Sequence, residues 1–404
     1  MLSNFNLEKT YQILLITLAF LMPLTVFGGN FIIVLIVLLW LISGNYKNKY
    51  NSIVKSKLLL ASIVFFGFHI VGMLWTNDLE WGLHILHKMW YFLLLFPILY
   101  TIVIKENIPK YIASFLLAIS FTEILSYLVW FELIEPFKNA STYNPTPFMS
   151  HITYNVILAL AIYLVLHRLV IQKDMRKVQT ILYSFFAISM SVNMFITGGR
   201  AGQVAYFVLL VILIFQFFKF DKIKAFFMAL CLVPVIFISA YQLSPIFNKR
   251  VDAAIINYSK FSPDIEISRA SSIGYRMTFQ LNSLEIIKKH PFIGVGTGDF
   301  PQEYKKVNMV NSPSIANATN PHNMYILITV QLGLLGLISF LSIFYFQFKT
   351  AFRSTNILVK NVGFALPMMF LVIMFSDSYL LGHYTTLMYI FFSSFLYRDF
   401  ESSS

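Results

Sequence analysis

The stretch TNPHNMYILITVQLGLLGLISF, Thr319 to Phe340, passes from a polar segment into a long apolar one, with a histidine at the junction. The apolar part is long enough to cross a bilayer, whose hydrocarbon core takes about 20 helical residues. The whole chain has the same character, because 58% of its 404 residues are hydrophobic and 12% are charged, against about 25% charged in soluble domains. Its mean hydropathy is +0.71. The sequence therefore predicts an integral membrane protein.

Apolar runs of about 17 to 25 residues recur from end to end and predict about twelve transmembrane helices. The predicted spans lie near 11–27, 29–44, 58–75, 82–103, 111–131, 152–170, 180–197, 201–218, 224–240, 323–346, 361–376 and 379–397. The fold class is thus all-α, with one large external, partly helical loop between spans 9 and 10. We divide the chain into helices 1–9 over residues 1–240, the loop over 241–321, and helices 10–12 with the C-terminus over 322–404.

Lysine and arginine in the short loops predict the orientation, because cytoplasmic loops carry an excess of both. Every second loop is basic if the N-terminus is inside: 47–57, 105–110, 168–177, 219–224 and 349–360. The other short loops hold mainly acidic residues. Both termini are therefore predicted to be cytoplasmic, and the large loop to be external.

The large loop is the one long hydrophilic segment, and it is net positive. It carries nine basic residues against six acidic ones: Lys249, Arg250, Lys260, Arg269, Arg276, Lys288, Lys289, Lys305 and Lys306 against Asp252, Asp264, Glu266, Glu285, Asp299 and Glu303. These charges form a solvated or headgroup-binding surface, or some of them bind an anionic substrate. The single cysteine, Cys231, excludes a disulfide framework and a thiol-based metal site.

An amphipathic helix is predicted in this loop from Ser271 until Pro291 ends it. Its apolar stripe consists of Ile273, Met277, Leu281, Leu284 and Ile287, and Arg276, Gln280 and Ser283 lie off that stripe. An arginine one turn from a glutamine can bind phosphate through its fork of donors. The alternative is an arginine that is simply exposed to solvent.

The stretch HPFIGVGTGDF, His290 to Phe300, predicts a tight turn because of its three glycines. It is not a dinucleotide fingerprint, since it follows a helix and has no βαβ unit around it. Asp299 is expected to cap the next helix. With no paired acidic motif in the loop, we expect no divalent metal.

His322 is expected in the first turn of an outward-facing helix, with Asn320 as the cap and Pro321 at the first position. A neutral imidazole there can accept a proton. The alternative is an interfacial histidine that only makes a hydrogen bond at headgroup level.

Arg200 lies between two predicted spans in FITGGRAGQVAYF, Phe195 to Phe207. An arginine so close to hydrocarbon is costly unless it is paired or binds an anion. Bare backbone at Gly199 would let a phosphate approach. His151, at the outer start of its span, lines the same entrance or is another interfacial histidine. Arg200, Arg276 and His322 are thus predicted on one side of the membrane.

Three motifs in this order resemble the O-antigen ligase and polymerase superfamily of polytopic bacterial envelope glycosyltransferases: TGGRAG, the arginine-bearing helix leading into HPFIGVGTGDF, and PHNMYILITVQLGLLGLISFL, Pro321 to Leu341. The resemblance implies an inner-membrane enzyme with a periplasmic, metal-independent site. It implies that Arg200 and Arg276 bind the diphosphate of an undecaprenyl-linked glycan donor while His322 assists the acceptor hydroxyl, with inversion. The resemblance implies membrane lipid as a partner, and it implies no cofactor and no nucleic-acid partner.

Within that superfamily a ligase moves the finished glycan to lipid A core, whereas a polymerase joins repeat units on the lipid carrier. Polymerases of the superfamily often have a second sizeable basic external loop. The other candidate for such a loop here, Glu132 to Ser150, is short and has almost no basic residues, which favours the ligase. A transporter is the alternative from another class. Glu123, His69 and Lys88 are the few ionisable residues within spans, and the two halves show no repeat.

Overall fold

A computed structural model describes residues 7–171, 175–262 and 270–400. The loop residues Asp264, Glu266 and Arg269 lie outside these ranges. The described residues form helices and turns, together with one isolated antiparallel β-bridge between Ser141 and Asn144. The prediction of an all-helical protein is confirmed.

Eight helical spans in the described ranges are long and apolar enough to cross a membrane, or up to nine if the bent pair α2 (Val26–Ile42) and α3 (Tyr46–Lys55) counts as one. The helix α17 (Ile357–Ile373) is apolar but shorter. Helices also occupy the first and last predicted spans, as α1 (Leu7–Leu21) and α18 (His383–Leu396). The twelve-span count stays a prediction.

The chain divides into two compact units, which are described separately. Unit 1 comprises residues 1–44 and 102–251. Its further helices are η3 (Lys105–Asn107), α7 (Ile108–Trp130), α8 (His151–Ile171), α9 (Lys177–Ile196), α10 (Arg200–Phe217), α11 (Lys222–Leu243) and the first part of α12 (Pro245–Ser259). The helix α8 is buried along most of its length and packs closely on α10. Gly202 makes this approach possible, since a Cβ there would collide with the main chain of Asn155.

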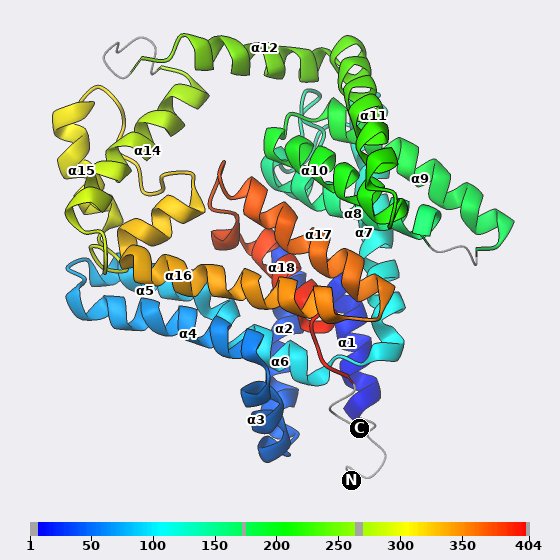
Figure 1. Ribbon diagram of the computed structural model, residues 1–404, viewed down its shortest axis with the longest axis horizontal. Coiled ribbons are helices and arrows are strands. Elements are labelled where there is room, and N and C mark those ends of the chain that lie inside the picture. Colours follow the sequence, from blue (N-terminus) through cyan, green and yellow to red (C-terminus); the bar gives the residue numbers. More distant parts are fainter. Residues whose placement is uncertain (1–6, 172–174, 263–269, 401–404) are drawn as a thin grey trace. The chain divides into compact units, whose positions relative to one another are not determined.

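Unit 2 comprises residues 45–101 and 252–404. Beside α3, α17 and α18 it contains α4 (Lys57–Gly72), η1 (Met73–Trp75), α5 (Leu79–Trp90), the π-helical η2 (Tyr91–Leu95), α6 (Phe96–Ile102), α14 (Ser272–Lys289), α15 (Phe300–Asn311), α16 (Met324–Arg353) and η4 (Tyr379–Leu381). Figure 1 shows α4, α5 and α16 running side by side, with α14 and α15 near the start of α16.

The glycine-rich loop of residues 290–299 fills a break in α16. The break is at Gly333, whose φ is 65°, and a Cβ there would collide with the main chain of Phe292. The loop pairs with both sides of the break: Val295 N donates to Val330 O at 2.9 Å, and Leu334 N donates to Pro291 O at 2.8 Å. The predicted structural turn is therefore confirmed, and it packs into the interruption of α16.

Asp299 holds the same loop against the turn before α5. Its carboxylate accepts hydrogen bonds from Asn77 N and Nδ2 and from Asp78 N, at 2.8 to 2.9 Å. The expectation that Asp299 caps its own helix is wrong, because it occupies the N-cap position of α15 without a side-chain cap bond. The carboxylate instead accepts from two backbone N–H groups that are 222 and 221 residues earlier in the sequence.

Candidate functional site

His322 lies in a strained turn just before α16, and not in its first helical turn as predicted. Its φ is 52°, a left-handed conformation that is uncommon for residues other than glycine. Its backbone N–H donates to Asn320 Oδ1 at 2.9 Å, so Asn320 closes a turn and does not cap the helix. The cap is Asn323, whose side chain accepts from Tyr325 N and Ile326 N. The turn holds the imidazole outside the helix.

Asp377, in the connection between α17 and η4, is the partner of His322. The Nδ1 atom of His322 lies 3.0 Å from Asp377 Oδ1. Asn320 ties the two segments together, because its Oδ1 also accepts from Ser378 Oγ at 2.9 Å. The imidazole of His322 is 34% exposed and the carboxylate of Asp377 is 19% exposed. This pair is thus held from two sides and remains open to a substrate.

The ionised form of Asp377 is favoured by its neighbours. Burial by itself would raise the pKa of this carboxyl group. The hydrogen bond and charge of His322, the backbone N–H of Ser378 and the charge of Arg276 outweigh burial, so the pKa is lowered from 3.8. Asp377 is therefore a carboxylate at neutral pH.

Arg276, on α14, completes the cluster in unit 2. Its Nη2 atom lies 3.6 Å from Asp377 Oδ2, and its side chain is 27% exposed. Phe279, three residues later, stacks on the ring of His322 with 6.1 Å between ring centroids. Gln280 follows one turn after Arg276 on the same helix and is half-buried. One short stretch of α14 thus supplies a cation, an amide and a platform for the imidazole.

The predicted bounds of α14 are confirmed, but its predicted buried face is wrong. Leu281 and Leu284 are each 41% exposed, whereas the buried positions are Gly274, Thr278, Asn282, Ser283 and Ile286. The Asn282 side chain donates to Tyr304, Asn308 and Ser312. Because buried amides have to be paired, this polar network and not the apolar stripe determines which face of α14 is buried. It thereby also determines the direction in which Arg276 projects.

In unit 1, the TGGRAG motif forms a turn between α9 and α10, and Arg200 is the first residue of α10. Asn155, fully buried on α8, donates to Gly199 O at 3.3 Å and accepts from Thr197 Oγ1 at 2.6 Å. A Cβ at Gly199 would collide with the carbonyl of His151. The missing side chain of Gly199 thus makes room for α8, and its contact with substrate stays a prediction.

Within unit 2, Arg276 and His322 meet at the carboxylate of Asp377, and Gln280 follows Arg276 on α14. Within unit 1, Gly199 and Arg200 lie close to His151. Convergence of the two groups stays a prediction. Asp377 was missed because it is a single acidic residue in a short loop that also holds His383. The sequence does contain one indication of its role: a lone carboxylate between two apolar spans is costly without a partner.

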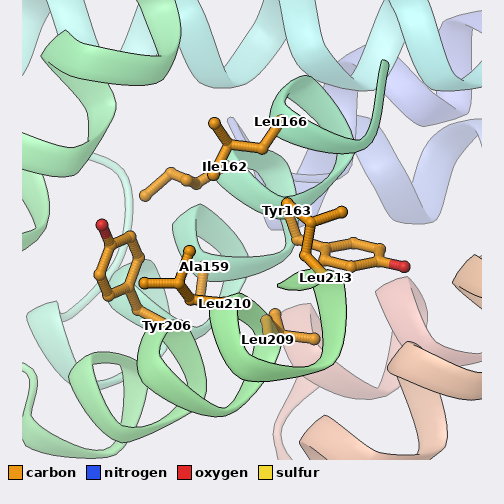
Figure 2. Close-up of a pocket in the computed structure, with 8 residues that line it drawn as sticks. All are labelled: Ala159, Ile162, Tyr163, Leu166, Tyr206, Leu209, Leu210 and Leu213. Carbon is orange, nitrogen blue, oxygen red and sulfur yellow. The ribbon is translucent and has the colours of Figure 1, made fainter. Parts of the chain in front are cut away.

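Two further features bear on the chemistry. Figure 2 shows an apolar pocket in unit 1 between α8 and α10, lined mainly by aliphatic residues such as Ile162 and Leu209, with Tyr163 and Tyr206. It offers no charged group for catalysis. Over the described ranges, no three His, Cys, Asp or Glu side chains gather in a way that could hold a metal ion.

A multi-pass helical protein with a histidine and a carboxylate paired beside an arginine is consistent with group transfer at a membrane surface. Residues 185–341 match the family model of O-antigen ligase. The resemblance to the O-antigen ligase and polymerase superfamily is thereby confirmed over the region that holds Arg200, Arg276 and His322. Members of this family are glycosyltransferase-like enzymes of bacterial membranes that act on lipid-linked glycans. Among curated proteins, none matches the chain significantly.

Proposed function

We propose that this protein transfers a glycan from an undecaprenyl-diphosphate carrier to the lipid A core, as an O-antigen ligase of the bacterial inner membrane. The observation that carries the proposal is the pairing of His322 with Asp377, next to Arg276. The family match over residues 185–341 supports the class of reaction. The active site is on the periplasmic side, where the large loop is predicted to lie.

In this mechanism His322 is the general base. A carboxylate at Nδ1 favours the tautomer with the proton on Nδ1, which leaves Nε2 as the acceptor. Nε2 takes the proton of the acceptor hydroxyl while its oxygen bonds to the anomeric carbon and the bond from that carbon to the diphosphate breaks. The electron pair of the broken bond goes to the diphosphate, and the configuration at the anomeric carbon inverts. Asp377 stabilises the imidazolium that forms.

The leaving diphosphate gains negative charge, which Arg276 and Arg200 stabilise. The ion pair with Asp377 orients the guanidinium of Arg276 and leaves donors for phosphate. Gln280 assists from the next turn of α14, and Gly199 and His151 border the donor on the side of Arg200. No metal ion is required for this neutralisation.

Transfer in a purified system tests the proposal. The protein is reconstituted in lipid nanodiscs with a synthetic undecaprenyl-diphosphate glycan and an acceptor, and the product is detected by mass spectrometry. We expect transfer by the wild-type protein, unaffected by a chelator, and loss of transfer with His322→Gln. Equal transfer by both proteins would disprove the role of the pair.

Glycan profiles of a deletion strain separate ligase from polymerase. A ligase deletion leaves the core without any long glycan, while long chains accumulate on the carrier. Single repeats attached to the core would instead identify a polymerase. Glycan retained on the cytoplasmic leaflet would indicate a transporter.

A further inference from the structure

The first turn of α12, the helix with which the large loop begins, is packed firmly in unit 1. Ser244 Oγ donates to Phe195 O at 2.6 Å, and Phe247 N donates to Ser244 Oγ at 3.1 Å. The ring of Phe247, 3% exposed, contacts the rings of Phe195 and Phe237, with centroids 5.0 and 5.3 Å apart. These contacts fix the first turn of α12 next to the end of α9.

Arg250 is one turn after Phe247 and lies against the TGGRAG turn. A Cβ built on Gly198 would be 3.1 Å from Nη2 and 3.2 Å from Nε of Arg250. Gly198 itself is held by Asn144, whose Oδ1 accepts its N–H at 3.0 Å. The absence of a side chain at Gly198 therefore lets a guanidinium approach the backbone of this turn.

Among the residues that the structure describes, the guanidinium of Arg250 has no hydrogen-bond partner and no carboxylate within ion-pair distance that would explain its position. It is half-buried, whereas the neighbouring Lys249 is exposed. A half-buried guanidinium without a protein partner has donors available for water or for a bound anion.

Positive charges gather at this turn. Arg250 and Arg200 both act electrostatically on His151, so both guanidinium groups lie close enough to His151 to disfavour its positive charge. An anion with several oxygens would be attracted by both groups. Two arginine forks suit a diphosphate better than a monophosphate, because each fork can hold one phosphate group.

We propose that Arg250 is a further donor-binding residue, which together with Arg200 and the Gly198 turn holds the diphosphate of the lipid-linked donor within unit 1. This inference rests on the proposed function for the identity of the anion. It extends the site to a loop residue that the sequence motifs do not single out. Arg250 binds substrate and takes no part in proton transfer.

Direct binding of a short prenyl diphosphate tests this inference independently of transfer. Farnesyl diphosphate and farnesyl monophosphate are titrated into the purified full-length protein in detergent. Arg250→Gln is compared with Lys249→Gln, which removes the same charge one residue away. We expect Arg250→Gln to weaken farnesyl diphosphate binding roughly 10-fold to 100-fold and Lys249→Gln to change it less than about twofold. Arg250→Lys should be intermediate, because it keeps the charge but loses the fork.

Each outcome is decisive if the thermal unfolding midpoints of the variants match that of the wild type. Equal losses in Arg250→Gln and Lys249→Gln would reduce the effect to general charge and overturn the inference. So would unchanged binding in Arg250→Gln, equal affinity of the wild type for monophosphate and diphosphate, or no binding by the wild type. If the expected binding pattern holds but the wild type transfers no glycan, the diphosphate site stands and the proposed function fails.

Discussion

The Nδ1 atom of His322 lies 3.0 Å from Oδ1 of Asp377, a residue 55 positions further along the chain. The contact joins the turn before α16 to the turn after α17, and it leaves Nε2 as the ring nitrogen that can face a substrate. The consequence for catalysis is that Asp377 should matter nearly as much as His322. The predictions below begin from this pair.

Replacing Asp377 with Asn should reduce the transfer rate roughly 100-fold to 10,000-fold, because the amide favours the wrong imidazole tautomer. Binding of the donor should weaken much less than transfer, because Arg276 and Arg200 keep their charges although the orienting ion pair is lost. Steady-state kinetics should thus show a fall in kcat that is far larger than the rise in KM for the donor. Ser376→Ala, which changes the residue immediately before Asp377, is the control and should be active. A wild-type kcat for Asp377→Asn would remove this residue from the mechanism.

The lowered pKa of Asp377 predicts a pH dependence of stability. The pKa in the folded state lies below the usual 3.8, so the carboxylate stabilises the fold above pH 3.8. This contribution is lost as the pH falls through the lower folded value. The unfolding midpoint of the wild type should therefore fall more steeply below pH 3.8 than that of Asp377→Asn. Parallel curves would show that the carboxyl group titrates alike in both states.

Replacing His322 with Ala should leave donor binding intact and slow transfer roughly 100-fold to 10,000-fold. The acidic limb of the pH profile, which reports protonation of the base, should disappear as well. Single-turnover transfer measured from pH 5 to 9 provides the test. An alanine variant with the wild-type rate and an intact acidic limb would leave His322 as an anchor of the turn.

Replacing Arg276 with Lys should abolish most transfer although the charge is kept, because the proposed mechanism needs one guanidinium to contact both Asp377 and the phosphate. We expect the same of Arg200→Lys. Protein levels in the membrane should stay normal, which immunoblotting can check. Full activity in either variant would identify that arginine as a replaceable surface charge.

Replacing Asp299 with Ala should destabilise the protein by about 3 kcal/mol, because the N–H groups of Asn77 and Asp78 lose their acceptor. The control is Asp221→Ala, which removes a similar but exposed acceptor from Lys224 N. Thermal unfolding in detergent should show a clear fall of the midpoint only for Asp299→Ala. Equal midpoints would show that the hydrogen bonds of Asp299 to Asn77 and Asp78 contribute nothing to stability.

The predicted sidedness can be tested with single cysteines in a Cys231→Ser background. Met309, 65% exposed on α15, is predicted to be periplasmic, and Thr355, exposed between α16 and α17, is predicted to be cytoplasmic. A membrane-impermeant maleimide added to intact spheroplasts should label Met309→Cys and not Thr355→Cys. The opposite result would place the proposed site on the wrong side for its substrate.

The sequence predicts the helices well where local signals act alone. The bounds of α14 follow from Ser271 as the cap and from Pro291, and α10 begins at Arg200 after two glycines. Such signals operate within a few residues, so they can be seen without knowledge of the tertiary structure. The resemblance in the three motifs gave the family for the same reason.

The parts that the sequence does not predict depend on distant partners. The hydropathy of α16 does not reveal the break at Gly333, because the loop that satisfies its backbone lies about 40 residues earlier by sequence. The buried face of α14 was misjudged because Asn282 finds three polar partners in other segments. Asp377 is recognised as a candidate only because it lies beside His322, and Arg250 only because it lies beside Gly198. Spacing in the sequence does not predict either contact.

The pairing of the glycine-rich loop with the broken α16 has a consequence for hydrogen exchange. The amides of Val295 and Leu334 belong to different segments, yet each is bonded across the break. Neither can exchange unless the loop and the helix separate, so both should exchange with similar, slow rates as one cooperative unit. The loop is therefore anchored, not a lid, and any opening that admits a lipid-linked glycan has to occur in other segments.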